Sequence, residues 1–285
     1  EKPNGKMWIG SRGNYIIDQM VDVHCHLNFK AFADDFDQVI KRAHQAGVQT
    51  IINTGTSIES SQRAVELAQE YSNLYAIVGI HPHHADKVKP GWDKEIEIIA
   101  KSSKKVVAIG EIGLDYYSYA SNGIVDPKLQ KEVFVKQIQL ANRLKLPLQI
   151  HNRQAGLDIL DILIDHQSSI VNLPPGMFHC MSGDIKLLKQ VLNLGFYIGF
   201  DGNITYEGIA KGEGTPLPEL VRNTPIERIV TETDAPYLTP EPHRGSRNTP
   251  VYVIIVAEEI AKIKKIPVAQ VKAITTQNAR KIFSI

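Results

Sequence analysis

Cysteine is scarce in this chain, and long apolar runs are missing. The two cysteines, Cys25 and Cys180, are too few for a disulfide scaffold, so we expect two buried free thiols and a reducing, cytoplasmic location. No apolar run approaches the roughly 18 residues that span a bilayer, which argues against a membrane protein. The formal net charge of +1 excludes a broad basic face that coats DNA, but it permits a local phosphate site.

Several catalytic signatures are also absent from the sequence. It contains no GxGxxG, no P-loop, no GxSxG and no CxxC motif. Nucleotide-cofactor enzymes, kinases and serine hydrolases therefore have no support, because each needs one of these motifs for its chemistry.

Short runs rich in valine and isoleucine recur from Met20 onward, and amphipathic helical patterns separate them. The runs alternate little between apolar and polar residues, as expected of parallel strands that are buried on both faces. Strands are predicted at residues 20–25, 50–54, 74–80, 106–109, 148–150, 177–178, 196–200 and 229–231, and helices at 35–47, 60–71, 127–146, 185–194, 250–263 and 268–283.

Eight such strand–helix units predict an α/β fold, a single-domain (β/α)₈ TIM barrel that spans residues 20–285. A doubly wound open sheet is the alternative, but it would not bring the first, middle and last strands to one point. Residues 1–19 are polar and glycine-rich without periodicity, so we expect them to be a flexible leader or tag outside the barrel.

Six residues of metal-ligand type stand at or just after the ends of predicted strands: His24, His26, Glu111, His151, His179 and Asp234. His24 and His26 lie two residues apart on a strand, so they share a face and can chelate one ion. Glu111 follows a glycine, which lets the backbone approach closely and suits a carboxylate that spans two ions. Only a closed ring of strands would gather all six.

Six ligands are more than one tetrahedral zinc needs, so we expect two divalent ions roughly 3.5–4 Å apart. His24, His26 and Asp234 would hold one ion, His151 and His179 the other, and Glu111 would bridge them. A hydroxide activated by the two metals would be the nucleophile, with Asp234 as its orienting base. The identity of the ions stays open among Mg, Mn and Zn, because histidine favours Zn or Mn and open oxygen positions permit Mg.

Further histidines and acids flank these ligands. His81 and His83, after the third strand, are expected to contact substrate, and His81 is a candidate catalytic residue that protonates a leaving group. Asp115 is interpreted as a partner of the ligands or a loop cap, and Glu232 as a buried partner on the face that carries Asp234.

Three arginines and a tyrosine are the candidate substrate-binding residues on the predicted rim. Arg153, two residues after His151, would meet a substrate phosphate or neutralise the carboxylates. Arg244 and Arg247 flank a glycine just before a predicted helix, which suits an anion, with a solvated basic loop as the alternative. Tyr237 lies three residues past Asp234 and is also predicted to contact substrate.

The motifs that carry these residues resemble those of the TatD family of metal-dependent deoxyribonucleases. In family order they read His24-Cys-His26-Leu, Gly79-Ile-His-Pro-His83, Gly110-Glu-Ile-Gly-Leu-Asp-Tyr116, Phe178-His-Cys-Met-Ser-Gly183 and Glu232-Thr-Asp-Ala-Pro-Tyr-Leu238. The resemblance covers essentially all of residues 20–285, and the family's ligand pattern falls on the six residues above. It implies a TIM barrel of the amidohydrolase superfamily and a metal-dependent DNase, often a 3′-to-5′ exonuclease, acting on single-stranded DNA or a DNA end.

The sequence departs from the family pattern at a few positions. Asn152 stands where serine is common, Met181 where phenylalanine is common and Ser246 where lysine is common. The last change removes one cation near the presumed phosphate site, whereas the metal ligands are untouched. No protein partner can be inferred from the sequence.

Three other functions compete with a nuclease. An amidohydrolase or lactonase acting on a small molecule usually bridges its ions with a carboxylated lysine, whereas Glu111 stands at that position here. A deacylase of aminoacyl-tRNA stays open. A barrel with a purely structural metal is disfavoured, because structural zinc sites are closed and usually use cysteine.

Overall fold

The computed structural model describes residues 19–120, 123–166, 176–209 and 212–285. In this part of the chain eight strands form one parallel sheet whose spatial order is the order of the sequence. The strands are β1 (Met20–Cys25), β2 (Val48–Thr54), β3 (Leu74–Val78), β4 (Val106–Asp115), β5 (Leu148–Arg153), β6 (Gly176–Phe178), β7 (Tyr197–Phe200) and β8 (Ile229–Thr231). The predicted (β/α)₈ barrel is therefore confirmed.

The sheet closes into a ring where β1 meets the segment that follows β8. The backbone N–H of His26 donates to the carbonyl of Ala235 at 2.7 Å, and the N–H of Asp234 donates to the carbonyl of His24 at 2.9 Å. The hydroxyl of Thr233 also donates to the buried carboxyl group of Asp22 at 2.7 Å. Closure of the ring thus places the first and last predicted ligands side by side.

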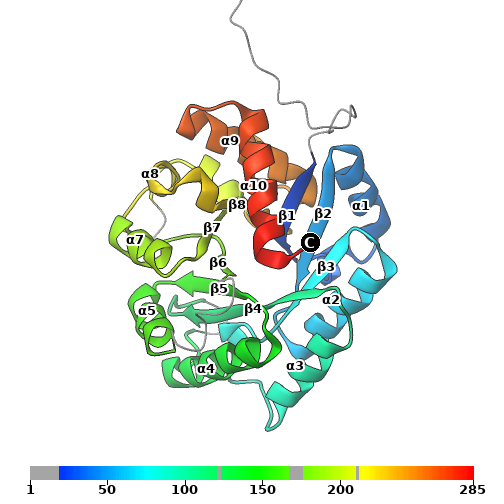
Figure 1. Cartoon of the computed structure of the whole chain (residues 1–285), viewed down its shortest axis with the longest axis vertical. Helices are drawn as coiled ribbons and strands as arrows, with labels where there is room; N and C mark the ends of the chain where they lie inside the picture. The colour runs from blue at the N-terminus through cyan, green and yellow to red at the C-terminus, as the bar shows by residue number, and fades with distance from the viewer. Residues whose placement is uncertain (1–18, 121–122, 167–175, 210–211) are drawn as a thin grey trace, which may run out of the picture.

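Helices surround the sheet on its outer side (Figure 1). They are α1 (Phe36–Gln45), α2 (Ile58–Glu70), α3 (Trp92–Lys101), α4 (Pro127–Leu144), α5 (Gly156–Asp165), α7 (Ile185–Asn193), α8 (Leu217–Asn223), α9 (Val253–Lys264) and α10 (Val268–Phe283). Short 3₁₀ turns η1 (Lys30–Phe32), η2 (Pro82–His84), η3 (Gly202–Thr205), η4 (Ile226–Arg228) and η5 (Pro250–Tyr252) lie between them. The sequence pattern had not indicated α3, α5 or α8, and the start predicted for the helix at 250–263 is the separate turn η5.

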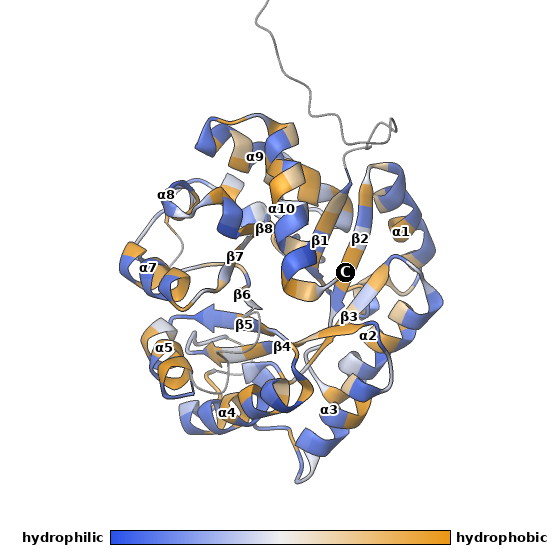
Figure 2. Cartoon of the chain, in the orientation of Figure 1, coloured by the Kyte–Doolittle hydropathy of each residue, from blue (hydrophilic) through white to orange (hydrophobic). Residues whose placement is uncertain are grey.

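The helix ends follow from local chemistry. The side chain of Ser57 accepts a hydrogen bond from the N–H of Ser60, and the hydroxyl of Ser60 reciprocates, which starts α2 with a capping box. The carboxylate of Asp126 caps α4, which has proline at its first position. Most helices are two-sided, with apolar residues against the sheet and polar residues outward (Figure 2).

The apolar core has two parts. The larger lies between the strands and the helices. The smaller gathers side chains from seven strands, and these can meet only inside the ring: Val21 and Val23, Ile52, Ile77, Val107 and Ala108, Met177, Tyr197 and Val230. Ala279, Ile282 and Phe283 of α10 join this inner cluster and close one end of the barrel. The carboxyl ends of the strands, where the predicted ligands stand, are therefore left for the site.

Two strands extend further at their carboxyl ends than their apolar runs indicated. β4 continues through Glu111 to Asp115, and β5 continues through His151 to Arg153. Gly113 makes the close pairing possible, because it has φ of +141° and a Cβ there would lie 2.0 Å from the carbonyl oxygen of His151. The predicted strand end at residue 109 was wrong because the glycines looked like a loop.

Three remaining expectations concern the two cysteines, membrane-spanning helices and the first residues of the chain. Cys25 is a free, fully buried thiol in the larger apolar cluster, as predicted, whereas Cys180 is free but only partly buried. None of the helices in the described segments is both long and apolar enough to cross a lipid bilayer. The prediction that residues 1–19 are a leader or tag falls outside the described residues, apart from Gln19.

Candidate metal centre

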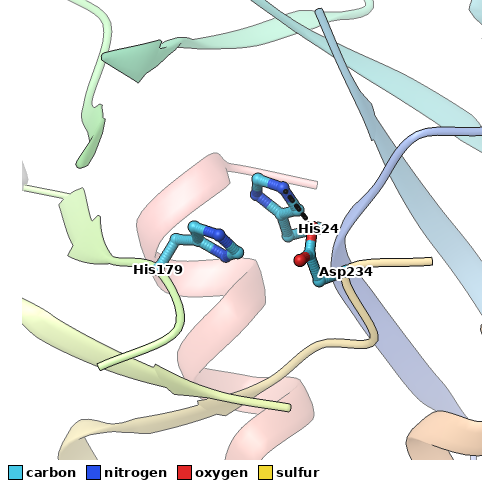
Figure 3. A group of neighbouring side chains, drawn as sticks. All are labelled: His24, His179 and Asp234. Atoms are coloured by element: carbon cyan, nitrogen blue, oxygen red, sulfur yellow. Dashed lines mark ion pairs between the residues drawn. The ribbon is translucent and has the colours of Figure 1, made fainter. Parts of the chain in front are cut away.

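The six predicted ligands form one cluster inside the open end of the barrel: His24, His26, Glu111, His151, His179 and Asp234. Each comes from the end of a strand or from the residues just after it. Figure 3 shows three of them, with the rings of His24 and His179 beside the carboxylate of Asp234. These two rings are stacked, with centroids 3.7 Å apart and an angle of 10° between their planes.

His24, His26 and Asp234 form the first part of the cluster. The Nε2 atoms of the two imidazoles lie 3.1 Å apart. Oδ1 of Asp234 lies 3.4 Å from Nε2 of His24 and 3.3 Å from Nε2 of His26. Asp234 has φ of +54°, a left-handed conformation that turns the chain just after β8. These three electron-rich atoms come from the first strand and from the segment after the last strand, and they converge on one small volume.

The opposite nitrogens of these two imidazoles have acceptors inside the protein. Nδ1 of His26 lies 2.9 Å from the carbonyl oxygen of Thr54, which can only accept, so Nδ1 carries the proton. Nδ1 of His24 lies 2.8 Å from Oε1 of the buried Gln149, whose amide nitrogen donates to the carbonyl of Val23 at 3.0 Å. In both neutral rings the lone pair is therefore on Nε2 and points into the cluster.

Glu111 faces two different sets of imidazoles with its two oxygens. Oε2 lies 3.7 Å from Nε2 of His24 and 3.8 Å from Nε2 of His26. Oε1 lies 2.8 Å from Nδ1 of His151 and 3.5 Å from Nε2 of His179. This is the placement that a carboxylate needs to contact two cations at once.

The second set of imidazoles also has partners on its outer side. Nε2 of His151 lies 3.0 Å from Oδ2 of Asp115, and Nδ1 of His179 lies 3.2 Å from Oε1 of Glu232. Glu232 is fully buried, and burial raises its pKa to about 8. All four histidines of the cluster therefore have one nitrogen turned to a protein acceptor and the other turned inward, as histidine ligands of metals have.

Burial and neighbouring groups shift the pKa values of the cluster residues in different directions. Burial favours the neutral form of Glu111, but the surrounding imidazoles, including the hydrogen-bonded His151, outweigh it and hold the pKa of Glu111 well below its usual range. Burial and the neighbouring His179 lower the pKa of His24. For His151 burial opposes protonation, yet the hydrogen bonds to Asp115 and Glu111 prevail and raise its pKa to about 10. The cluster is thus built around an anionic centre that attracts positive charge.

The donor atoms fit divalent cations. In their neutral form His24 and His26 would direct two lone pairs at each other and at a carboxylate, an arrangement that is stable only with a proton or a cation between them. Three groups of donor atoms are close enough to hold one ion each: His24, His179 and Asp234; His24, His26 and Glu111; and His81, Glu111 and His151. The groups overlap, so the structure gathers the predicted ligands without dividing them between two ions.

His81 and His83 border the cluster on the side of Glu111. Nε2 of His81 lies 3.6 Å from Oε1 of Glu111, and its Nδ1 accepts a hydrogen bond from the N–H of His83 at 3.1 Å. Burial lowers the pKa of His81 well below the usual value for histidine, so the ring is neutral with its proton on Nε2. Nε2 of His83 lies 3.1 Å from Oδ2 of Asp115. Asp115 is therefore a shared acceptor for His83 and His151 rather than a member of the central cluster.

Arg153 stands at the mouth on the same face of β5 as His151, because side chains two residues apart on a strand point the same way. Its guanidinium lies over the ring of Tyr117, 4.1 Å from the centroid, and donates to the hydroxyl of Tyr119 at 2.8 Å. The hydroxyl of Tyr119 in turn donates to Asp115 at 3.0 Å. Arg153 is thus a fixed cation roughly 6–7 Å further along the strand than His151.

The other rim residues lie on the loop after β8. Arg247 forms a two-pronged ion pair with Asp35, with nitrogen–oxygen distances of 2.9 and 2.6 Å. Arg244 is exposed and lies over the ring of Tyr206, 4.0 Å from the centroid. Tyr237 is 54% exposed, and its ring lies 6.4 Å from that of His26. Of these three predicted substrate-binding residues, the structure places Tyr237 beside the cluster and engages Arg247 elsewhere.

Sequence reasoning missed several groups that the site uses. Gln149 and the carbonyl of Thr54 orient two of the histidines, and Tyr119 joins Asp115 to Arg153. Gln149 carried a signal, since it lies two residues before His151 on the same face of a strand. The carbonyl of Thr54 carried none, because a backbone group has no sequence signature.

Comparison with known proteins finds relatives along nearly the whole chain. The family described as TatD related DNase matches residues 21–284. YabD of Bacillus subtilis, named a metal-dependent hydrolase, is 38% identical over 93% of this chain and 99% of its own. A Salmonella typhimurium protein named 3′-5′ ssDNA/RNA exonuclease TatD is 34% identical, also over 93% of this chain and 99% of its own. The crystal structure of YJJV, a TatD homologue from Escherichia coli, superposes with a TM-score of 0.84 at 29% identity, covering 95% of this chain and all of that one.

Proposed function

Because the chain belongs to the TatD related DNase family of metal-dependent hydrolases, we propose that it cleaves the phosphodiester bonds of single-stranded DNA, one nucleotide at a time from the 3′ end. The 3′-to-5′ direction and the single-stranded substrate come from the name of the Salmonella relative. The fold and the site agree with such a reaction, since the open end of a TIM barrel is where enzymes of this fold bind substrate.

The observation that carries the proposal is the position of Glu111. Its two oxygens face different imidazoles, and the outer nitrogen of each of these imidazoles lies within 3.2 Å of a protein acceptor. A single structural ion would need only one such set. A carboxylate between two sets supports a pair of ions, which suits phosphodiester hydrolysis because both the attacking and the leaving oxygen need charge neutralisation.

We assign the ligands as the sequence predicted them. His24, His26 and Asp234 would hold one ion, His151 and His179 would hold the other, and Glu111 would contact both. When bound, the ions supply a lowered pKa for water and positive charge for the phosphate. The donor set mixes nitrogen with oxygen, so it does not select among Mg, Mn and Zn. Titration of the protein with each metal would identify the ions.

The remaining side chains orient the reactants. Burial favours the neutral form of Asp234, but the neighbouring imidazoles of His24 and His26 outweigh it and keep its pKa low, so its carboxylate is available to accept a proton from water. His81 carries its proton on Nε2 and faces the same opening as Glu111, so it donates a hydrogen bond to the phosphate or to the leaving oxygen. Together with Glu111, which would contact both ions, Asp234 and His81 are the catalytic residues that we propose.

Arg153 is the cation placed to hold the substrate phosphate. It lies directly above His151 along β5, and the stacked ring of Tyr117 and the hydroxyl of Tyr119 fix its guanidinium. A guanidinium that is already ordered loses little entropy when it binds phosphate oxygens. His83, beside Asp115, lines the same side of the mouth and completes this phosphate-binding side.

A single substitution tests the proposal. Glu111→Gln keeps the shape of the side chain but removes its charge, so cleavage of DNA should fall at least about 100-fold, the loss expected when an electrostatic group of the site is removed. Glu97→Gln, a change of a partly buried surface residue on α3 outside the cluster, should leave cleavage unchanged. Circular dichroism of both variants should match the unsubstituted protein. Full activity of Glu111→Gln would refute the two-ion site.

The direction and the substrate need separate assays. A single-stranded oligonucleotide with a 5′ label should shorten stepwise, whereas one with a 3′ label should release a labelled mononucleotide at once. Aminoacyl-tRNA and small lactones should remain intact with Mg²⁺, Mn²⁺ or Zn²⁺. Hydrolysis of either compound without cleavage of DNA would replace the nuclease by a deacylase or a lactonase.

A further inference from the structure

We propose that Phe29 and Tyr237 form a stacking site for an unpaired nucleobase that flanks the scissile phosphate. This inference rests on the proposed nuclease function and adds the part of the substrate that the metal centre and Arg153 do not contact. The two rings form an aromatic corner at the rim, with their centroids 6.4 Å apart and their planes 73° from one another.

The aromatic corner adjoins the metal centre directly. The ring of Phe29 is stacked on the imidazole of His26, with centroids 4.5 Å apart and an interplanar angle of 11°. The ring of Tyr237 meets the same imidazole edge-on at 6.4 Å. A phosphate held beside His26 would therefore bring the base of an adjacent nucleotide within reach of both rings.

The position in the ring of strands favours this use. Phe29 follows β1 and Tyr237 follows β8, whereas Arg153 ends β5. Since the strands run around the barrel in sequence order, the β8–β1 junction lies across the mouth from β4 and β5. A substrate that crosses the mouth thus has a cation on one side of its phosphate and an aromatic surface on the other.

Tyr237 combines an exposed ring with a fixed backbone. Its N–H donates to the carbonyl of Asp234 at 2.8 Å, and its carbonyl accepts from the side-chain amide of the buried Asn248. Exposure of 54% leaves much of the ring open to a ligand. An aromatic ring on a fixed backbone loses little entropy on binding, which is the property of aromatic anchors in binding sites.

Arg247 joins the two sides of the aromatic corner. It lies on the loop that carries Tyr237, and it binds Asp35 and the carbonyl of Ala31 on the segment that carries Phe29. Its guanidinium also lies over the ring of Phe32, 4.7 Å from the centroid. The structure therefore gives Arg247 a role in holding the aromatic corner together instead of the phosphate contact that the sequence suggested.

Stacking on an exposed ring requires a base that is free on at least one face, which a base inside a duplex is not. The aromatic corner thus gives a physical reason for a preference for single strands. Every base has a π-face, so the site would tolerate any sequence.

The experiment compares the unsubstituted protein and its variants on two oligonucleotide substrates. One oligonucleotide carries all of its bases, and the other has tetrahydrofuran abasic units at the two nucleotides of its 3′ end. Tyr237→Leu should raise KM for the complete oligonucleotide by roughly 5- to 150-fold, the effect of losing one base–aromatic stack, and should leave KM for the abasic one unchanged. Tyr237→Phe keeps the ring and should behave like the unsubstituted protein. Tyr252→Leu, a rim tyrosine whose ring stacks on His243, is the matched control and should show no base-dependent loss.

Binding provides a readout that does not depend on cleavage. Fluorescence anisotropy of the same 5′-labelled oligonucleotides in EDTA should show tighter binding of the complete one, and Tyr237→Leu should abolish the difference. If the protein cleaves neither oligonucleotide but keeps this Tyr237-dependent difference, the nuclease proposal fails and the stacking site stands. If it cleaves DNA and Tyr237→Leu affects both oligonucleotides equally, or neither, the stacking site is refuted while the nuclease function stands.

Discussion

Gln149 offers a test of how the protein orients a proposed metal ligand. Its Oε1 atom accepts the Nδ1 proton of His24 at 2.8 Å, and its amide nitrogen donates to the carbonyl of Val23 at 3.0 Å. Gln149→Met preserves the volume of this fully buried side chain but removes both hydrogen bonds, together with the one that the hydroxyl of Thr54 donates to Oε1 at 3.3 Å. His24 would then be free to rotate or to carry its proton on the wrong nitrogen.

The size of the effect follows from those two contacts. Loss of a partner that orients a histidine ligand typically weakens metal binding by about 10- to 100-fold. The buried carbonyl of Val23 and Nδ1 of His24 would also be left unpaired, each at about 1–3 kcal/mol of folding stability. We therefore expect Gln149→Met to need about 10 to 100 times more metal for half-maximal cleavage, and to unfold at a lower denaturant concentration.

The control separates metal binding from stability. Gln137 on α4 is equally buried and makes two hydrogen bonds to the backbone of Ile80, at 2.7 and 3.0 Å, but none to a proposed ligand. Gln137→Met should lower stability by a similar amount without changing the metal requirement. Calorimetric titration with Mn²⁺ or Zn²⁺ measures affinity directly. The reasoning would be refuted if both variants showed the affinity of the unsubstituted protein, or if both lost it equally.

Two further predictions concern charge. Burial, followed by the charges of Glu232 and Asp234, raises the pKa of Asp201 from 3.8 to about 7. Since the folded chain then binds this proton more tightly than the unfolded chain, the free energy of unfolding in EDTA should fall by at most about 4 kcal/mol as pH rises from about 4 to 7. Asp201→Asn cannot ionise and should flatten that slope in urea titrations; equal slopes would contradict the burial argument. Arg153→Leu should raise KM for DNA by about 10-fold or more with little change in metal affinity, and Arg153→Lys should recover only part of it, because a lysine cannot match the two-pronged guanidinium. A KM unaffected by Arg153→Leu would show that phosphate is held elsewhere.

The barrel was predictable because its signal is local and repeated. Each strand was recognisable in the sequence as a short apolar run, and the long helices α4 and α10 were recognisable as amphipathic stripes with clear ends. The helices α3, α5 and α8 were missed, although α1 and α7 are of similar length and were predicted. The end of β4 was misplaced because Gly110 and Gly113 break the apolar run, although the tight packing against β5 requires them.

The candidate site was predictable only in part. The clustering of the six candidate ligands was predictable because parallel strands in a ring bring their carboxyl ends together, so position along each strand fixes position in the site. The partners that orient them could not be found, because they depend on contacts across the barrel, such as that between His24 and Gln149, 125 positions apart in sequence. For Arg247 the pattern of two arginines around a glycine fitted an anion, yet the residue that it meets is Asp35.

One strand illustrates how the fold converts sequence order into chemistry. Gln149, His151 and Arg153 lie on one face of β5 at spacings of two residues, so they stand at successive heights from the interior to the mouth. Gln149, the lowest, orients His24 on another strand. His151, the middle one, faces Glu111, and Arg153, the highest, faces the opening. Because the register pairs Gly113 with His151 and Asp115 with Arg153, a slip of one residue would turn all three side chains to the outer face. The glycine in β4 that allows this close register is therefore as necessary to the proposed reaction as the ligands that it positions.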